Sequence, residues 1–70
     1  MNLRAPLPGK ILRRCFMSGE EVEKGDTICI LESMKMQIFV PAPTKGVVQW
    51  KVEEGAVVMR GEIITAVNPR

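Results

Sequence analysis

The chain has 70 residues, of which 46% are hydrophobic and 26% charged, a composition typical of one small globular domain. A domain of this size buries only ~60% of the surface of its unfolded chain, which disfavours a deep substrate cleft. Ten basic against eight acidic residues leave a net charge of +2, too little to indicate a nucleic-acid partner. No apolar run approaches the ~20 residues that span a bilayer, and no signal peptide is evident, so we expect a cytoplasmic protein without membrane insertion.

Short segments rich in Val, Ile and other strand formers alternate with turn residues along the chain, and no segment keeps a helical period for long. The predicted strands are, in chain order, residues 10–16, 27–31, 37–40, 47–52 and 62–67. Pro, Gly, Asn and Asp mark many of the turns between them. The pattern predicts an all-β fold in which residues 1–70 form a single domain.

The sequence contains no His and no Tyr, and its two cysteines, Cys15 and Cys29, form no CxxC pair. Neither a metal site nor a redox pair is therefore indicated. We expect both cysteines to be buried in strands, because free Cys is among the most buried residue types. Trp50 is expected to be partly buried, since its ring is large and its indole N–H needs an acceptor.

The chain contains an internal duplication. Residues 19–28 align with residues 55–64 at a constant offset of 36, and an Ala-Pro pair and a Gly before them repeat at an offset of 37. Two copies are too few for a solenoid, so we expect two equivalent halves that cover each other's apolar face about a pseudo-twofold axis. The matched glycines are expected where a turn needs positive φ or where two backbones approach closely.

The segment between the second and third predicted strands, Glu32-Ser33-Met34-Lys35-Met36, is unusual for a tight turn. It contains no Asn, Asp or Gly, and each residue held at positive φ there costs about 1 kcal/mol or more. One interpretation is an ordinary solvated lysine, with the two methionines in a continuous strand or in the core. The other is a lysine amine exposed at a hairpin tip between the two halves, which a modifying enzyme can reach, with the methionines as adaptable contacts for a partner.

This segment resembles the biotin attachment motif, commonly Glu-Ala/Ser-Met-Lys-Met, of the biotin carboxyl carrier domains of biotin-dependent carboxylases. Residues 5–11, Ala-Pro-Leu-Pro-Gly-Lys-Ile, resemble the opening of those domains, and the turn glycines of both halves also match. The resemblance implies a flattened barrel (a barrel-sandwich hybrid) of two four-stranded antiparallel sheets with pseudo-twofold symmetry. It implies covalent biotin on Lys35, recognised through the flanking residues Glu32, Ser33, Met34 and Met36.

The resemblance also implies a mechanism and partners. A biotin protein ligase joins biotin to Lys35 through biotinyl-adenylate, a biotin carboxylase carboxylates it with ATP and bicarbonate, and a carboxyltransferase passes the carboxyl group to an acceptor. The chain is then a non-catalytic carrier, without catalytic residues or metal ligands. It lies in the cytoplasm, or in the mitochondrial matrix if it belongs to a eukaryotic carboxylase.

The sequence departs from the family pattern in two places, and the first of them narrows the kind of carrier that we expect. The chain has no room between Gly9 and Lys35 for the protruding thumb of some bacterial acetyl-CoA carboxylase carriers. This favours the thumbless carriers of acyl-CoA, pyruvate or oxaloacetate systems. Residues 37–39, Gln-Ile-Phe, replace a more polar stretch and leave that strand unusually apolar and available for contact.

Two alternatives stay open. Lipoyl domains share the fold, but their lysine usually lies in Asp-Lys-Ala, so Met34 and Met36 favour biotin over lipoate. An unmodified barrel-sandwich module, such as those of membrane-fusion adaptors, would use the hairpin only as a structural element.

Overall fold

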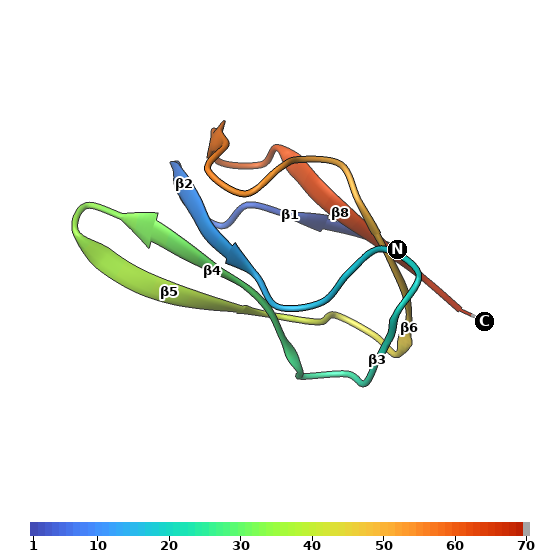
Figure 1. Ribbon diagram of the computed structural model, residues 1–70. Coiled ribbons are helices and arrows are strands. Elements are labelled where there is room, and N and C mark those ends of the chain that lie inside the picture. Colours follow the sequence, from blue (N-terminus) through green and yellow to red (C-terminus); the bar gives the residue numbers. More distant parts are fainter. Residues whose placement is uncertain (70) are drawn as a thin grey trace.

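Every regular element of the chain is a β-strand in the computed structural model, which describes residues 1–69. The strands are β1 (Asn2–Arg4), β2 (Gly9–Arg14), β3 (Glu21–Val22), β4 (Thr27–Ser33), β5 (Met36–Pro41), β6 (Gly46–Trp50), β7 (Val57–Val58) and β8 (Ile63–Asn68). They form two four-stranded antiparallel sheets, in the orders β1-β8-β6-β3 and β5-β4-β2-β7, which stack as a flattened barrel (Figure 1). The predicted all-β, two-sheet architecture is confirmed. No helix that could cross a membrane occurs within the described chain.

The five predicted strands correspond to β2, β4, β5, β6 and β8, with ends that differ by at most two residues. The sequence did not indicate β1, β3 and β7, each of which has only two or three residues. Segments so short show no alternation of their own. They are strands because a longer neighbour, β8, β6 or β2, offers its backbone hydrogen-bonding groups to them.

The order of the strands confirms the pseudo-twofold relation between the two halves. Moving each strand of the sheet β1-β8-β6-β3 by four places in the chain, with β8 and β6 returning to β4 and β2, produces the sheet β5-β4-β2-β7. Hydrogen bonds outside the strands repeat in the same way. Ala5 N donates to Glu62 O at 2.9 Å, and Ala42 N donates to Asp26 O at 2.7 Å. Each half therefore closes its loops on the other half.

Two kinds of glycine make this arrangement possible, as the duplication predicted. Gly25 and Gly61 adopt φ values of 93° and 86° in equivalent turns, a region that favours glycine. Gly9 and Gly46 do not need positive φ. A Cβ atom at Gly9 would overlap the carbonyl oxygen of Glu32, and one at Gly46 would overlap that of Asn68. These two glycines allow neighbouring strands to pack closely.

The core lies between the two sheets and consists of aliphatic side chains from both halves. Its largest fully buried members are Ile11, Ile28, Leu31, Ile64, Val22, Val48, Val58 and Val67. Cys29 is buried among them, and this burial, with a smaller contribution from nearby Cys15, raises the pKa of its thiol from 9.0 to about 11. The prediction that Cys15 is also buried in a strand is wrong. Cys15 is exposed, because β2 ends at Arg14 and the chain leaves the sheet there.

The β4–β5 hairpin and the ends of the described chain lie at opposite ends of the long axis (Figure 1). The domain measures 35 Å along this axis and 18 Å across it. Beside the end of β8, the N-terminal ammonium of Met1 donates to Val67 O at 2.9 Å. The hairpin therefore stands alone at its end of the molecule.

Candidate functional site

Lys35 lies at the tip of the hairpin between β4 and β5. Ser33 and Met36 are paired across the two strands, so that Met34 and Lys35 alone form the turn. Their φ values are 50° and 65°, and two consecutive positive values are those of a type I′ hairpin turn. They are the only non-glycine residues with positive φ among residues 1–69. The strained turn that the sequence predicted is therefore present, and the continuous strand is excluded.

The pairing of β4 with β5 explains how Met34 and Lys35 are held in this conformation. Six residue pairs join the two strands, and Leu31, two residues before the base of the hairpin, is fully buried. Ser33 adds a second anchor, because its hydroxyl donates to Pro8 O at 2.6 Å and its side chain is almost fully buried. This contact spans 25 residues, and no local sequence signal could have revealed it.

The tip exposes an amine and two thioethers. Lys35 is exposed, and the exposed fractions of Met34 and Met36 are 80% and 56%. Within residues 1–69, Lys35 takes part in no ion pair, and Glu32 is exposed in the outward row of β4 beside Gln37 and Lys10. The hairpin thus brings together all five residues that the sequence singled out. Ser33 faces the barrel, whereas the other four are open to solvent.

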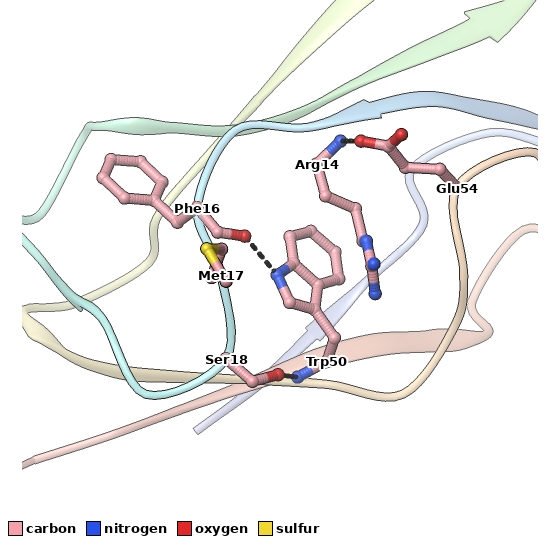
Figure 2. A pocket seen from close by; sticks show the side chains of 6 residues that line it. All are labelled: Arg14, Phe16, Met17, Ser18, Trp50 and Glu54. Atoms are coloured by element: carbon pink, nitrogen blue, oxygen red, sulfur yellow. Dashed lines mark hydrogen bonds between the residues drawn. The ribbon is translucent and has the colours of Figure 1, made fainter.

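A pocket of about 360 Å³ lies where β2 ends at Arg14, the end of that strand away from the hairpin, and Figure 2 shows the residues that line it. Arg14 and Trp50 face each other there, with the guanidinium 5.6 Å from the centre of the indole ring, and they are equivalent positions of the two halves. Trp50 is half-buried, as expected, and its Nε1 donates to Phe16 O at 2.7 Å. Its backbone N–H is bonded to Ser18 Oγ, just as that of Arg14 is bonded to Glu54 Oε2. The polar groups at this pocket hold the two halves together.

The structure is thus a two-sheet barrel with one lysine exposed on a strained hairpin turn. Comparison with known proteins identifies the family. The family profile described as "Biotin-requiring enzyme" matches residues 1–67, nearly the whole chain. The chain belongs to this family of biotin and lipoyl attachment domains.

Relatives of known name support the assignment. The chain is 49% identical over 47 residues to the gamma subunit of methylmalonyl-CoA decarboxylase from Veillonella parvula, covering 67% of this chain and 36% of that protein. It is 34% identical over 68 residues to a biotinylated protein (TB7.3 homolog) from Mycobacterium leprae, covering 96% of each. The crystal structure of Kluyveromyces lactis urea carboxylase matches with a TM-score of 0.89 and 26% identity, over 97% of this chain and 6% of that one. The chain thus spans about a third, or far less, of the larger proteins that it resembles.

Proposed function

We propose that this chain is a biotin carboxyl carrier, in which the carboxyl group of biotin forms an amide with Lys35 Nζ. The observation that supports this most directly is the hairpin tip, where two residues at positive φ place Lys35 in solvent between two exposed methionines. The family and the names of the relatives support biotin as the group that is attached. The residues fit such a group, because the lysine amine is exposed and engaged in no ion pair within the described chain.

Attachment uses Lys35 as the nucleophile. Its neutral amine attacks the carboxyl carbon of biotinyl-adenylate, the amide bond forms and AMP leaves. The amine must lose a proton, and within residues 1–69 no carboxylate pairs with Lys35 to receive it. A base of the biotin protein ligase therefore takes this proton. The carrier contributes an accessible nucleophile on a rigid hairpin and performs no catalysis itself.

When bound, biotin supplies a ring nitrogen that accepts a carboxyl group at a biotin carboxylase and releases it at a carboxyltransferase. The chain supplies reach and position for this transfer. A lysine side chain together with the valeryl chain of biotin extends on the order of 14 Å, so the ring can enter a deep site while the barrel stays outside. Attachment also replaces free diffusion with a high local concentration near each active site.

The segment that connects β2 to β4 supports a thumbless carrier. Only residues 15–26 lie between these strands, and they include β3 and two tight turns. Within residues 1–69, a connection this short leaves no room for a protruding thumb. We therefore propose that the acceptor belongs to an acyl-CoA, pyruvate or oxaloacetate system, and the name of the Veillonella relative agrees with an acyl-CoA. We also propose that residues 1–70 form one carrier domain.

The proposal is tested by expressing the chain with a biotin protein ligase and biotin and then measuring the intact mass. We expect a gain of one biotinyl group, which Lys35→Arg abolishes. Lys24→Arg is the matched control, because Lys24 is also exposed in a tight turn, and it should not change the gain. A lipoyl gain in cells that supply both cofactors would favour the lipoyl alternative. No gain would favour an unmodified module.

A further inference from the structure

Because the two halves of the fold are equivalent, a surface position in one half can be compared with the matching position in the other half. On the sheet that carries the hairpin, Phe39 of β5 pairs with Ile30 of β4. On the other sheet, Asn2 of β1 pairs with Ala66 of β8 at the equivalent place. The outward positions of one sheet can therefore be compared, one by one, with those of the other.

Three positions differ in the same direction. Phe39, Val57 and Met59 are large apolar residues with exposed fractions of 62%, 76% and 66%. Their counterparts on the other half are Asn2, Glu21 and Glu23, all polar and exposed. The same backbone accepts polar residues at these positions, so the fold does not require apolar ones. The three residues lie along the two edges of one sheet, Phe39 on β5 and the other two on and just after β7. Exposed apolar residues that the fold does not require, present on only one of two equivalent sheets, mark a contact with another molecule.

The turns that follow Met59 and Glu23 show that these two positions are equivalent. Met59 N donates to Glu62 Oε1 at 3.0 Å, and Glu23 N donates to Asp26 Oδ2 at 2.9 Å. The two backbones therefore fold alike, although one turn exposes a thioether and the other a carboxylate. Glu23 is also engaged in an ion pair with Lys45 at 3.8 Å.

Charges on the two sheets differ as well. Lys10 and Arg13 lie on the outward side of β2, where they pair with Glu32 and Ile30 of β4. Neither basic residue takes part in an ion pair within residues 1–69. We call Phe39, Val57, Met59, Lys10 and Arg13 together the lysine-side face. Exposed Glu32, which pairs with Lys10 across the strands, offsets one of the two positive charges. An excess of one positive charge therefore remains beside the apolar side chains after Lys35 becomes an amide.

The size of the lysine-side face indicates what kind of complex it can form. The 21 residues of β2, β4, β5 and β7, with ~4.8 Å between strands and ~3.4 Å rise per residue, give an area on the order of 350 Å². A stable complex usually buries ~800 Å² on each partner, so this face suits a weak, transient contact. A symmetric pair of these faces would also bring Lys10 and Arg13 of two copies toward each other, which disfavours a second copy as the occupant.

We propose that the lysine-side face docks on the catalytic partners of the carrier, through a contact surface that is apolar and carries carboxylates opposite Lys10 and Arg13. This inference rests on the proposed function, because the same end of the domain bears Lys35. Because β5 and β7 are the two edges of the sheet, Phe39 contacts the partner at one edge and Val57 and Met59 at the other. The basic residues speed the encounter and make it sensitive to salt.

The test measures the binding of the biotinylated chain to the purified biotin carboxylase and carboxyltransferase of the same cell. One variant carries Phe39→Asn, Val57→Glu and Met59→Glu, which installs the residue of the counterpart at each position. The matched control carries Asn2→Phe, Glu21→Val and Glu23→Met on the opposite sheet. A third variant carries Lys10→Gln and Arg13→Gln. The dissociation constant is obtained by titration of the isotope-labelled carrier in NMR, and circular dichroism checks the fold of each variant.

We expect the first variant to raise Kd at least tenfold for one or both enzymes, whereas the opposite-sheet control changes it less than twofold. The Lys10 and Arg13 variant should lose most of the salt dependence of binding. A Kd within twofold of wild type for both enzymes would overturn the inference. So would an effect confined to the KM of the biotin protein ligase, or a dimer of the free carrier that the first variant dissociates. Failure of the proposed function is distinguishable, because the wild-type chain then gains no biotinyl mass.

Discussion

The β4–β5 hairpin and the junction of β8 with β1 occupy equivalent places in the two halves, but they are built differently. At the hairpin, Met34 and Lys35 close a covalent turn with φ values of 50° and 65°. At the junction no turn connects the strands, and the Met1 ammonium lies 3.4 Å from Asn68 Oδ1. In both places two antiparallel neighbouring strands are held by backbone hydrogen bonds, in one sheet at the hairpin and in the other at the junction. The framework therefore supports either arrangement, and only one of them presents a lysine.

The largest effect is expected at Gly9 and Gly46, the two glycines at which neighbouring strands pack closely. Gly9→Ala and Gly46→Ala each place a Cβ atom against a carbonyl oxygen of the adjacent strand, which must then move. We expect each to lower the free energy of unfolding by more than about 3 kcal/mol, a large share of the stability of so small a domain. Thermal unfolding followed by circular dichroism measures the change. Gly19→Ala, where no atom lies within 4 Å of the new Cβ, is the control and should lose less through its positive φ alone.

The second prediction uses Cys29, whose counterpart in the other half, Thr65, does not titrate in this range. Because the pKa of Cys29 is 9.0 when unfolded and about 11 when folded, the unfolded state binds fewer protons between these values. The free energy of unfolding should therefore be fully retained below pH 9 and fall by about 1 kcal/mol per pH unit up to pH 11. Denaturant unfolding of Cys29→Ala beside wild type isolates this contribution. Equal slopes for the two proteins would contradict the prediction.

The third prediction compares the hydrogen bond that anchors the hairpin with a similar hydrogen bond on the other sheet. Ser33→Ala removes the hydrogen bond to Pro8 O, and Thr65→Ala removes one to Gln49 O on the other sheet. Each should lower the free energy of unfolding by about 1–2 kcal/mol. Only Ser33→Ala should also increase amide hydrogen exchange at Met34 and Lys35 and slow biotin attachment. Equal exchange at the hairpin in both variants would show that the Ser33 hydroxyl does not hold it.

The smallest expected effect concerns the methionines at the tip. Met34→Leu and Met36→Leu keep an apolar side chain of similar volume, so unfolding should change by less than about 1.5 kcal/mol. The flexible thioether adapts to several surfaces better than a branched side chain does. We therefore expect a few-fold slower carboxyl transfer between partner enzymes and a smaller effect on the rate of ligation. Transfer at the wild-type rate in both variants would rule out this role.

The sequence was most informative where a local rule and the fold agree or visibly conflict. Val- and Ile-rich runs predicted β2, β4, β5, β6 and β8, and the glycine spacing predicted the pseudo-twofold relation. The missing turn formers before Met36 predicted the strained tip. The family resemblance implied eight strands, but the residue pattern did not locate the short strands β1, β3 and β7, because pairing with distant neighbours creates them. The anchor between Ser33 and Pro8 and the exposure of Cys15 likewise depend on where the folded chain leaves or meets a sheet.

The position of the hairpin at one extremity of a 35 Å body has a mechanical consequence. If the barrel is attached to another protein beside β1 or β8, the domain rotates about that point. The amine of Lys35 then lies almost the whole length of the domain away from the axis of rotation. A modest swing about this axis would then sweep the lysine through an arc longer than its own side chain can span. The length of the rigid barrel, as much as the flexible lysine side chain, therefore sets how far apart two active sites can lie.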